Sequence, residues 1–171
     1  GKHGKNVQHL YLTNCWELSN DATPIINKFG QKLRTLSLSN SWNLSDSGLE
    51  LLSLPLCKRI SLTNLRKIRS PGVLSLLSNS NINTITLSYC KSVGNDALIH
   101  PAWADIKYAD FSRCTGISDE GFLAWTTFVN SNESREVDID EDAMVIDNTI
   151  PASLSTGQFF SMKALFLNDC S

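Results

Sequence analysis

The sequence predicts an α/β fold, a right-handed solenoid that forms a horseshoe-shaped arc. An apolar pattern, hydrophobic-x-x-hydrophobic-x-hydrophobic, recurs along the chain, and its second position falls at nearly even intervals, at 10, 36, 60, 85 and 109. Most copies are followed by an Asp or Asn and then a second apolar run, which is typical of a helix start. One unit of this length cannot bury its own apolar face, so neighbours must stack. We therefore expect a parallel β-sheet on the concave face and short helices on the convex face.

The strand part of each unit follows one template. The first copy reads Val7-x-x-Leu10-x-Leu12-x-x-Cys15-x-x-Leu18. Further copies begin near residues 33, 57, 82, 106 and 162. Terminal units of such arrays normally need polar caps, and here the chain opens on one copy and ends within another. We therefore expect residues 1–171 to be one segment of a longer solenoid.

The interval between the copies at 109 and 165 is about twice as long as the earlier intervals, so it holds either two steps or one insertion. Within it, residues 133–147 alone hold 7 of the 17 acidic residues of the chain. The midpoint reads Ser134-x-x-Val137-x-Ile139-x-x-Asp142, which matches the template spacing. We therefore interpret residues 130–150 as a degenerate acidic repeat that begins near 134. An acidic disordered loop is the alternative.

Short helices are predicted to follow the strands. A Ser or Asp ahead of an apolar run can accept hydrogen bonds from the free N–H groups of a first helical turn, and a carboxylate suits the positive end of the helix dipole. The clearest examples are Ser45-Asp46-x-Gly48-Leu49 and Ser118-Asp119-x-Gly121-Phe122.

Composition excludes several other classes of protein. The chain is 42% hydrophobic and 19% charged, which suffices for a folded core. Its net charge of −2 predicts no bulk attraction to nucleic acid or membrane. No apolar run approaches the roughly 18 residues of a membrane helix, and the first residues lack the apolar stretch of a signal peptide. Five cysteines without a C-x-x-C pair suit a reducing compartment, so we expect the nucleus and/or the cytoplasm.

A binding surface is predicted from strand geometry. Side chains alternate along a strand, so residues between the template positions should point onto the concave face. Small hydroxyls there would leave room for a protein partner, and aromatic residues are favoured interface anchors, although Ser and Thr also simply suit an exposed sheet. The predicted partner-binding residues are His9, Tyr11, Ser37, Arg59, Ser61, Thr86, Tyr108, Asp110, Asp138, Asp140 and Phe166.

No catalytic, metal or cofactor site is predicted, so we expect no enzyme. The three histidines have no Cys or carboxylate at a recognisable spacing, and phosphate-loop, nucleotide and hydrolase motifs are absent. The cysteines at the template position should be buried and inert. A basic cluster over 58–69 is interpreted as a solvated edge, with phosphate or acidic-protein binding as the alternative. Trp16 and Trp42 should stack on one rim, either as packing or as a partner anchor.

The residues resemble a known family. The template, with Cys at 15, 90, 114 and 170 and the Ser-Asp-x-Gly pattern, is similar to the cysteine-containing leucine-rich repeat of the F-box and leucine-rich-repeat proteins and of related fungal repair and cell-cycle proteins. Ser41, Leu65 and Asp142 depart from it at the Cys position. The resemblance implies a non-catalytic module that recognises substrates for a cullin-type (SCF) ubiquitin ligase.

The resemblance also implies the partners. A protein substrate would bind the concave face, while a Skp1-type adaptor and a cullin would bind through regions outside this segment. The F-box itself is not among these residues. Neither direct nucleic-acid binding nor a membrane partner is expected. The alternative is a leucine-rich-repeat scaffold, for example in DNA repair, replication or cell-cycle control, without F-box function.

Overall fold

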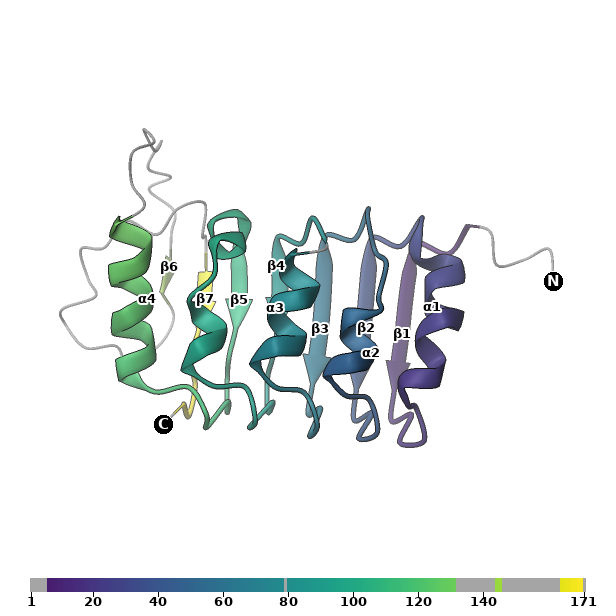
Figure 1. Cartoon of the computed structure of the whole chain (residues 1–171), viewed down its shortest axis with the longest axis horizontal. Coiled ribbons are helices and arrows are strands. Elements are labelled where there is room, and N and C mark those ends of the chain that lie inside the picture. Colours follow the sequence, from purple (N-terminus) through teal and green to yellow (C-terminus); the bar gives the residue numbers. More distant parts are fainter. Residues whose placement is uncertain (1–5, 79, 132–143, 146–163, 171) are drawn as a thin grey trace.

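The computed structural model describes residues 6–78, 80–131, 144–145 and 164–170, and it is a mixed α/β structure built on one parallel sheet. Seven strands lie in the order β1-β2-β3-β4-β5-β7-β6, and each strand is parallel to its neighbours (Figure 1). The strands are β1 (His9–Thr13), β2 (Thr35–Ser39), β3 (Arg59–Thr63), β4 (Thr84–Thr86), β5 (Tyr108–Asp110), β6 (Met144–Val145) and β7 (Ala164–Phe166). The predicted α/β class and parallel sheet are confirmed.

The helices lie on one side of the sheet (Figure 1). Among the described residues, no helix or strand covers the opposite side. The α-helices are α1 (Thr23–Gly30), α2 (Asp46–Glu50), α3 (Ser70–Ser78) and α4 (Asp119–Ser131), and the 3-10 helices are η2 (Asn20–Ala22), η3 (Asn95–Leu98) and η4 (Pro101–Asp105). Each of the first four strands is therefore followed by a helical segment that returns the chain to the start of the next strand, and β5 is followed by α4.

The strands pair in register, so equivalent residues of successive units form rows across the sheet. Leu36 and Leu38 are fully buried, whereas Ser37 between them is half-buried and points to the other face. The predicted alternation is therefore confirmed. One row of template residues comprises Leu10, Leu36, Ile60, Ile85, Ala109 and Leu165.

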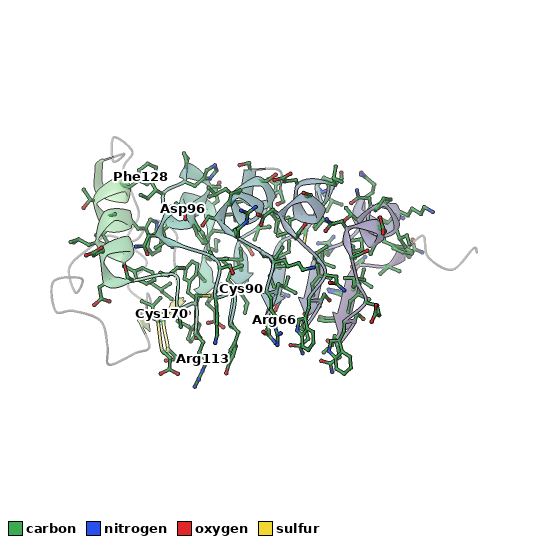
Figure 2. The ribbon with its side chains drawn as sticks, turned by 60° about the horizontal axis from the view of Figure 1, so that its bottom comes forward. Arg66, Cys90, Asp96, Arg113, Phe128 and Cys170 are labelled. Atoms are coloured by element: carbon green, nitrogen blue, oxygen red, sulfur yellow. The ribbon has the colours of Figure 1, made fainter. Side chains whose placement is uncertain are left out.

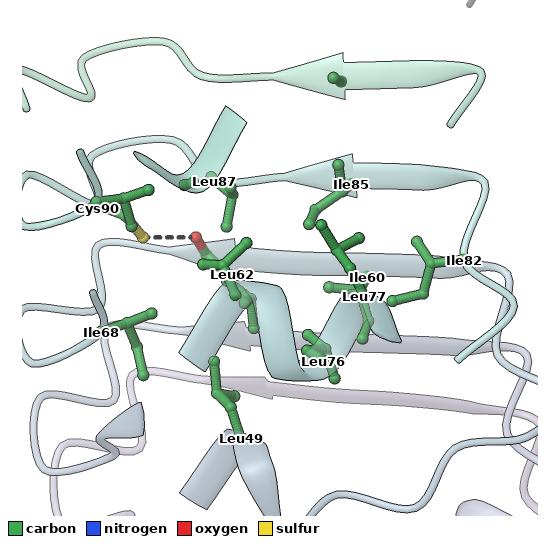
Figure 3. Packing of buried hydrophobic residues seen from close by; sticks show 14 of the residues in the cluster. Leu49, Ile60, Leu62, Ile68, Leu76, Leu77, Ile82, Ile85, Leu87 and Cys90 are labelled. Carbon is green, nitrogen blue, oxygen red and sulfur yellow. Dashed lines mark hydrogen bonds between the residues drawn. The ribbon is translucent and has the colours of Figure 1, made fainter. Parts of the chain in front are cut away.

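The hydrophobic core fills the space between the sheet and the helices. Leu76 and Leu77 of α3 face Ile60 and Leu62 of β3 (Figure 3), and all four are at most 3% exposed. Burying each such side chain contributes about 1.5–3 kcal/mol. Toward β5 the core becomes aromatic, with successive ring centroids 5.4–6.2 Å apart among Trp103, Phe111, Phe122 and Trp125.

The acidic interval does not add a strand between the units that begin near 106 and 162. Ala109 of β5 pairs directly with Leu165 of β7, and the Phe111 N–H donates to the Phe166 carbonyl at 2.9 Å. The place beside β5 is thus filled by β7. The segment Met144–Val145 forms β6 on the far side of β7. Residues 132–143 and 146–163, most of the predicted acidic repeat, lie outside the described residues.

The Ser-Asp-x-Gly motif joins neighbouring units instead of capping its own helix. Helix α2 begins at Asp46 as predicted, but Ser45 makes no side-chain cap hydrogen bond. The Asp46 carboxylate accepts from the backbone N–H and the Nε of Arg69 in the next unit, at 2.7 and 2.9 Å. An added Cβ at Gly72 would lie 2.6 Å from Asp46 Oδ1, so glycine is required for this close approach.

The same contact recurs in two other units. Asn95 accepts from the Ser118 N–H at 2.9 Å and donates to the Ser118 hydroxyl at 2.9 Å, directly against Gly121 of α4. Asn20 makes the equivalent pair of bonds to Ser45. The glycine of the motif therefore leaves space for a polar side chain of the preceding unit.

We predict that Gly121→Ala destabilises the protein by about 1–3 kcal/mol, although Gly→Ala inside a helix usually stabilises by up to about 1 kcal/mol. The new methyl group would overlap the Asn95 side chain and break its bonds to Ser118. Urea unfolding measures the effect. In an Asn95→Gly background, which also removes the Asn95 Cβ that lies 2.9 Å from the added methyl group, the same substitution should cost much less; an equal cost in both backgrounds would contradict the proposed contact.

Candidate protein-interaction surface

The outward side chains of the strands form what we call the exposed sheet face. It is the sheet surface opposite the helices (Figure 1). It comprises His9, Tyr11, Thr13, Thr35, Ser37, Ser39, Arg59, Ser61, Thr63, Thr84, Thr86, Tyr108, Asp110 and Phe166. Nine of the eleven predicted partner-binding residues lie on this face, while Asp138 and Asp140 lie outside the described residues.

Two tyrosines are the most prominent apolar groups of this face. Tyr11 on β1 is 64% exposed and Tyr108 on β5 is 42% exposed. Four strand spacings of about 4.8 Å separate their strands by about 19 Å. The residues of β2 to β4 between them are mainly Ser and Thr, with Arg59 as the single long side chain. The two rings therefore flank a stretch of short, hydrogen-bonding side chains.

Several polar groups of the exposed sheet face already have partners within the protein. His9 Nδ1 lies 3.0 Å from the Thr35 hydroxyl. The Asp110 carboxylate accepts from the Ser88 hydroxyl at 2.7 Å and from the Ser112 N–H at 2.8 Å. Asp110 thus stabilises the end of β5, and a partner would have to compete for its oxygens.

A residue in the left-handed conformation follows each of β1 to β5 and β7, and the sequence analysis missed this feature. Asn14 has φ 58°, and its N–H donates to the Ser39 carbonyl of β2 at 3.0 Å. Asparagine tolerates this conformation better than most residues, so an Asn directly before the Cys position was the available signal. The equivalent residues are Asn14, Asn40, Asn64, Tyr89, Arg113 and Asp169.

These turns align the loops that follow the strands into one edge, which we call the loop edge. Asn40 donates to Asn14 at 2.6 Å and Asn64 donates to Asn40 at 2.7 Å, so the amides form a ladder. Beside this ladder Trp16 and Trp42 stack at 5.8 Å with an interplanar angle of 18°, which confirms the predicted pair. The predicted basic cluster contributes Arg66, whose guanidinium lies 4.1 Å from the Trp42 ring centroid.

Two of the four template cysteines are buried packing residues as predicted, whereas Cys15 and Cys170 are only half-buried. Cys90 and Cys114 are fully buried, and their thiols donate to the carbonyls of Leu62 (3.0 Å; Figure 3) and Leu87 (2.8 Å) of the preceding units. Burial raises the pKa of Cys90 to about 11 and raises that of Cys114 further. Both thiols therefore stay protonated and unreactive near neutral pH, as predicted.

A hollow of about 610 Å³ lies at the opposite edge, beside the end of α3 and η4, and its lining includes Lys58, His100, Asp105 and Lys107. His100 Nδ1 accepts from the Ala102 N–H at 3.1 Å, so this ring is used in starting η4. The described residues contain no group of three His, Cys, Asp or Glu that could hold a metal ion. Within that same part of the chain, no helix has the length and apolarity needed to cross a membrane.

Comparison with known proteins agrees with the fold. A chain in the crystal structure of the Rad7 and Elc1 complex in yeast is similar, with a TM-score of 0.55 and 19% sequence identity over 68% of this chain. The match covers 32% of that chain, so this protein spans about one third of its length. No family model matches the sequence, and no curated protein does. At this identity the likeness concerns the fold alone.

We predict that Cys90 makes the protein less stable above pH 9. Its pKa is raised from 9.0 to about 11 by burial, so the folded state holds the proton more tightly than the unfolded state. This stabilisation is complete below pH 9 and is lost as the pH rises toward 11. At pH 10 the loss in the free energy of unfolding amounts to about 1 kcal/mol. Urea unfolding at pH 8 and pH 10 under reducing conditions measures it.

The control for this prediction is Cys90→Ala. That variant is less stable at every pH because it loses packing, but its stability should fall less steeply between the two pH values. Lysine and tyrosine titrations are common to both proteins and cancel in the comparison. Equal slopes for the two proteins would contradict the prediction.

Proposed function

We propose that this chain is a segment of a cysteine-containing leucine-rich-repeat solenoid that acts as a non-catalytic protein-binding module. The in-register units, the row of buried residues and the thiol-to-carbonyl bonds of Cys90 and Cys114 support the repeat assignment. The likeness to a chain of the Rad7–Elc1 complex supports it as well.

We propose the exposed sheet face as its binding site. The observation that carries this proposal is the pair of exposed rings, Tyr11 and Tyr108, on a face that no described helix or strand covers. Tyrosine gives a large contact area and a hydroxyl at a small entropic cost, and it is enriched at energetically dominant interface positions. The short Ser and Thr side chains between the rings let a partner approach the strands closely.

A finer proposal names the pathway. We propose that the full protein recognises substrates for a cullin-type ubiquitin ligase in the nucleus or cytoplasm, with a Skp1-type adaptor bound outside this segment. The family resemblance supports this, and the similar yeast chain belongs to a complex of Rad7 with Elc1. A leucine-rich-repeat scaffold without an F-box uses the same face and is the second candidate.

We predict that Tyr11→Ala combined with Tyr108→Ala removes the bound partners while changing thermal stability little. Both rings are exposed, so their loss opens no core cavity. Quantitative mass spectrometry of proteins cross-linked to the full-length protein measures the loss. The matched control is Ile25→Ala with Leu123→Ala, which removes exposed apolar groups (57% and 60%) from the helices. Equal partner recovery from both double variants would contradict the exposed sheet face as the site.

The ubiquitin-ligase proposal has a separate test. The full-length protein should co-purify with a Skp1-type adaptor, and the Tyr11/Tyr108 double variant should retain the adaptor while it loses the substrate. Absence of the adaptor from a preparation that still holds its sheet-face partners would favour the scaffold.

A further inference from the structure

The loop edge carries a row of exposed cations. Arg66, Lys91 and Arg113 come from three consecutive units, in the loops that follow β3, β4 and β5, and all three are exposed. Arg66 and Arg113 project from the same edge of the molecule (Figure 2). Two strand spacings of about 4.8 Å separate the units of these two residues by about 10 Å, and Lys91 comes from the unit between them.

Both guanidinium groups are held by aromatic rings. The Arg66 guanidinium lies 4.1 Å from the centroid of Trp42, whose other face stacks on Trp16. The Arg113 guanidinium lies 5.4 Å from the centroid of Tyr89. A stacked guanidinium keeps its N–H groups in its plane, directed outward, a geometry that suits bidentate binding of a carboxylate. Stacking also reduces the side-chain entropy lost on binding.

Positive charge prevails along the loop edge even though the whole chain has a net charge of −2. Lys67 adds a fourth cation and donates to Asn43 at 3.0 Å. Against these stand Glu17 and Asp169, and Asp169 forms an ion pair with Arg113 at 2.7 Å. Both members of this pair are largely exposed, at 51% and 62%, so an incoming carboxylate can compete with Asp169 for the guanidinium.

We propose that the loop edge binds an extended acidic peptide segment of a partner protein, whose Glu or Asp carboxylates contact Arg66, Lys91 and Arg113. An extended peptide advances about 3.3 Å per residue, so three of its residues span the roughly 10 Å between the units of Arg66 and Arg113. Single-stranded nucleic acid is disfavoured because bases need free aromatic faces. Both faces of Trp42 are occupied and Arg113 covers a face of Tyr89, so of the two indoles on the loop edge only Trp16, which is 55% exposed, offers a stacking surface. This surface is distinct from the exposed sheet face.

The test measures fluorescence anisotropy of a fluorescein-labelled poly-Glu peptide titrated with the protein, beside a poly-Ser peptide and single-stranded oligothymidine. We expect binding of poly-Glu alone, weakened by salt. Arg66→Ala should reduce the affinity roughly tenfold. Arg66→Lys should lose most of the same affinity because it keeps the charge but not the planar fork. Asp169→Asn should raise the affinity because it frees Arg113.

The matched control is Lys28→Ala, which removes one exposed cation from α1 and should leave the affinity unchanged. Thermal unfolding by circular dichroism checks that each variant folds, and Lys91→Ala replaces Arg66→Ala if the latter does not. Equal affinity for the wild-type and Arg66→Ala proteins would overturn the proposal, as would full retention by Arg66→Lys. Tighter, Arg66-dependent binding of oligothymidine would overturn it in favour of nucleic acid.

Discussion

The structure depends on the register between successive parallel strands. Each strand finds its hydrogen-bond partners only in the neighbouring units, and the ladder continues past the strand through the left-handed residue, as in the bond from the Asn14 N–H to the Ser39 carbonyl. Because equivalent residues then lie one strand spacing apart, similar side chains fall into rows. The row of core residues, the amide ladder, the thiol-to-carbonyl bonds and the stacked indoles all follow from this one constraint.

The fold was predictable because short-range alternation determines which side chains are buried. Leu36 and Leu38 inside with Ser37 outside, the buried Cys90 and the Trp16–Trp42 stack all follow from position within the repeat. The order of the strands near the C-terminal end was not predictable from this alternation, because it depends on the lengths of the connecting segments. The long interval between positions 109 and 165 was compatible with either an extra unit or an insertion, and only the direct pairing of β5 with β7 decides the strand order.

The features of the candidate surfaces were likewise predictable only in part. Periodicity placed Tyr11 and Tyr108 on the outward face, but it could not reveal that Asp110 is bound by Ser88 and Ser112. The basic cluster was visible in sequence, yet its members have different roles. Arg69 is joined to Asp46, whereas Arg66 lies over Trp42. The identity of the side chain in the adjacent unit decides between these roles, and that information lies one full repeat away in sequence.

The four tryptophans form two pairs near opposite ends of the described array. Trp16 and Trp42 are nearly parallel and partly open to solvent, whereas Trp103 and Trp125 meet at 66° inside the core. Electronic coupling between two indoles depends on their mutual orientation, so the pairs have different optical signatures. Near-ultraviolet circular dichroism can therefore report the loss of packing at one end separately from the other. The protein thus contains its own probes of whether all its units unfold together or one end unfolds first.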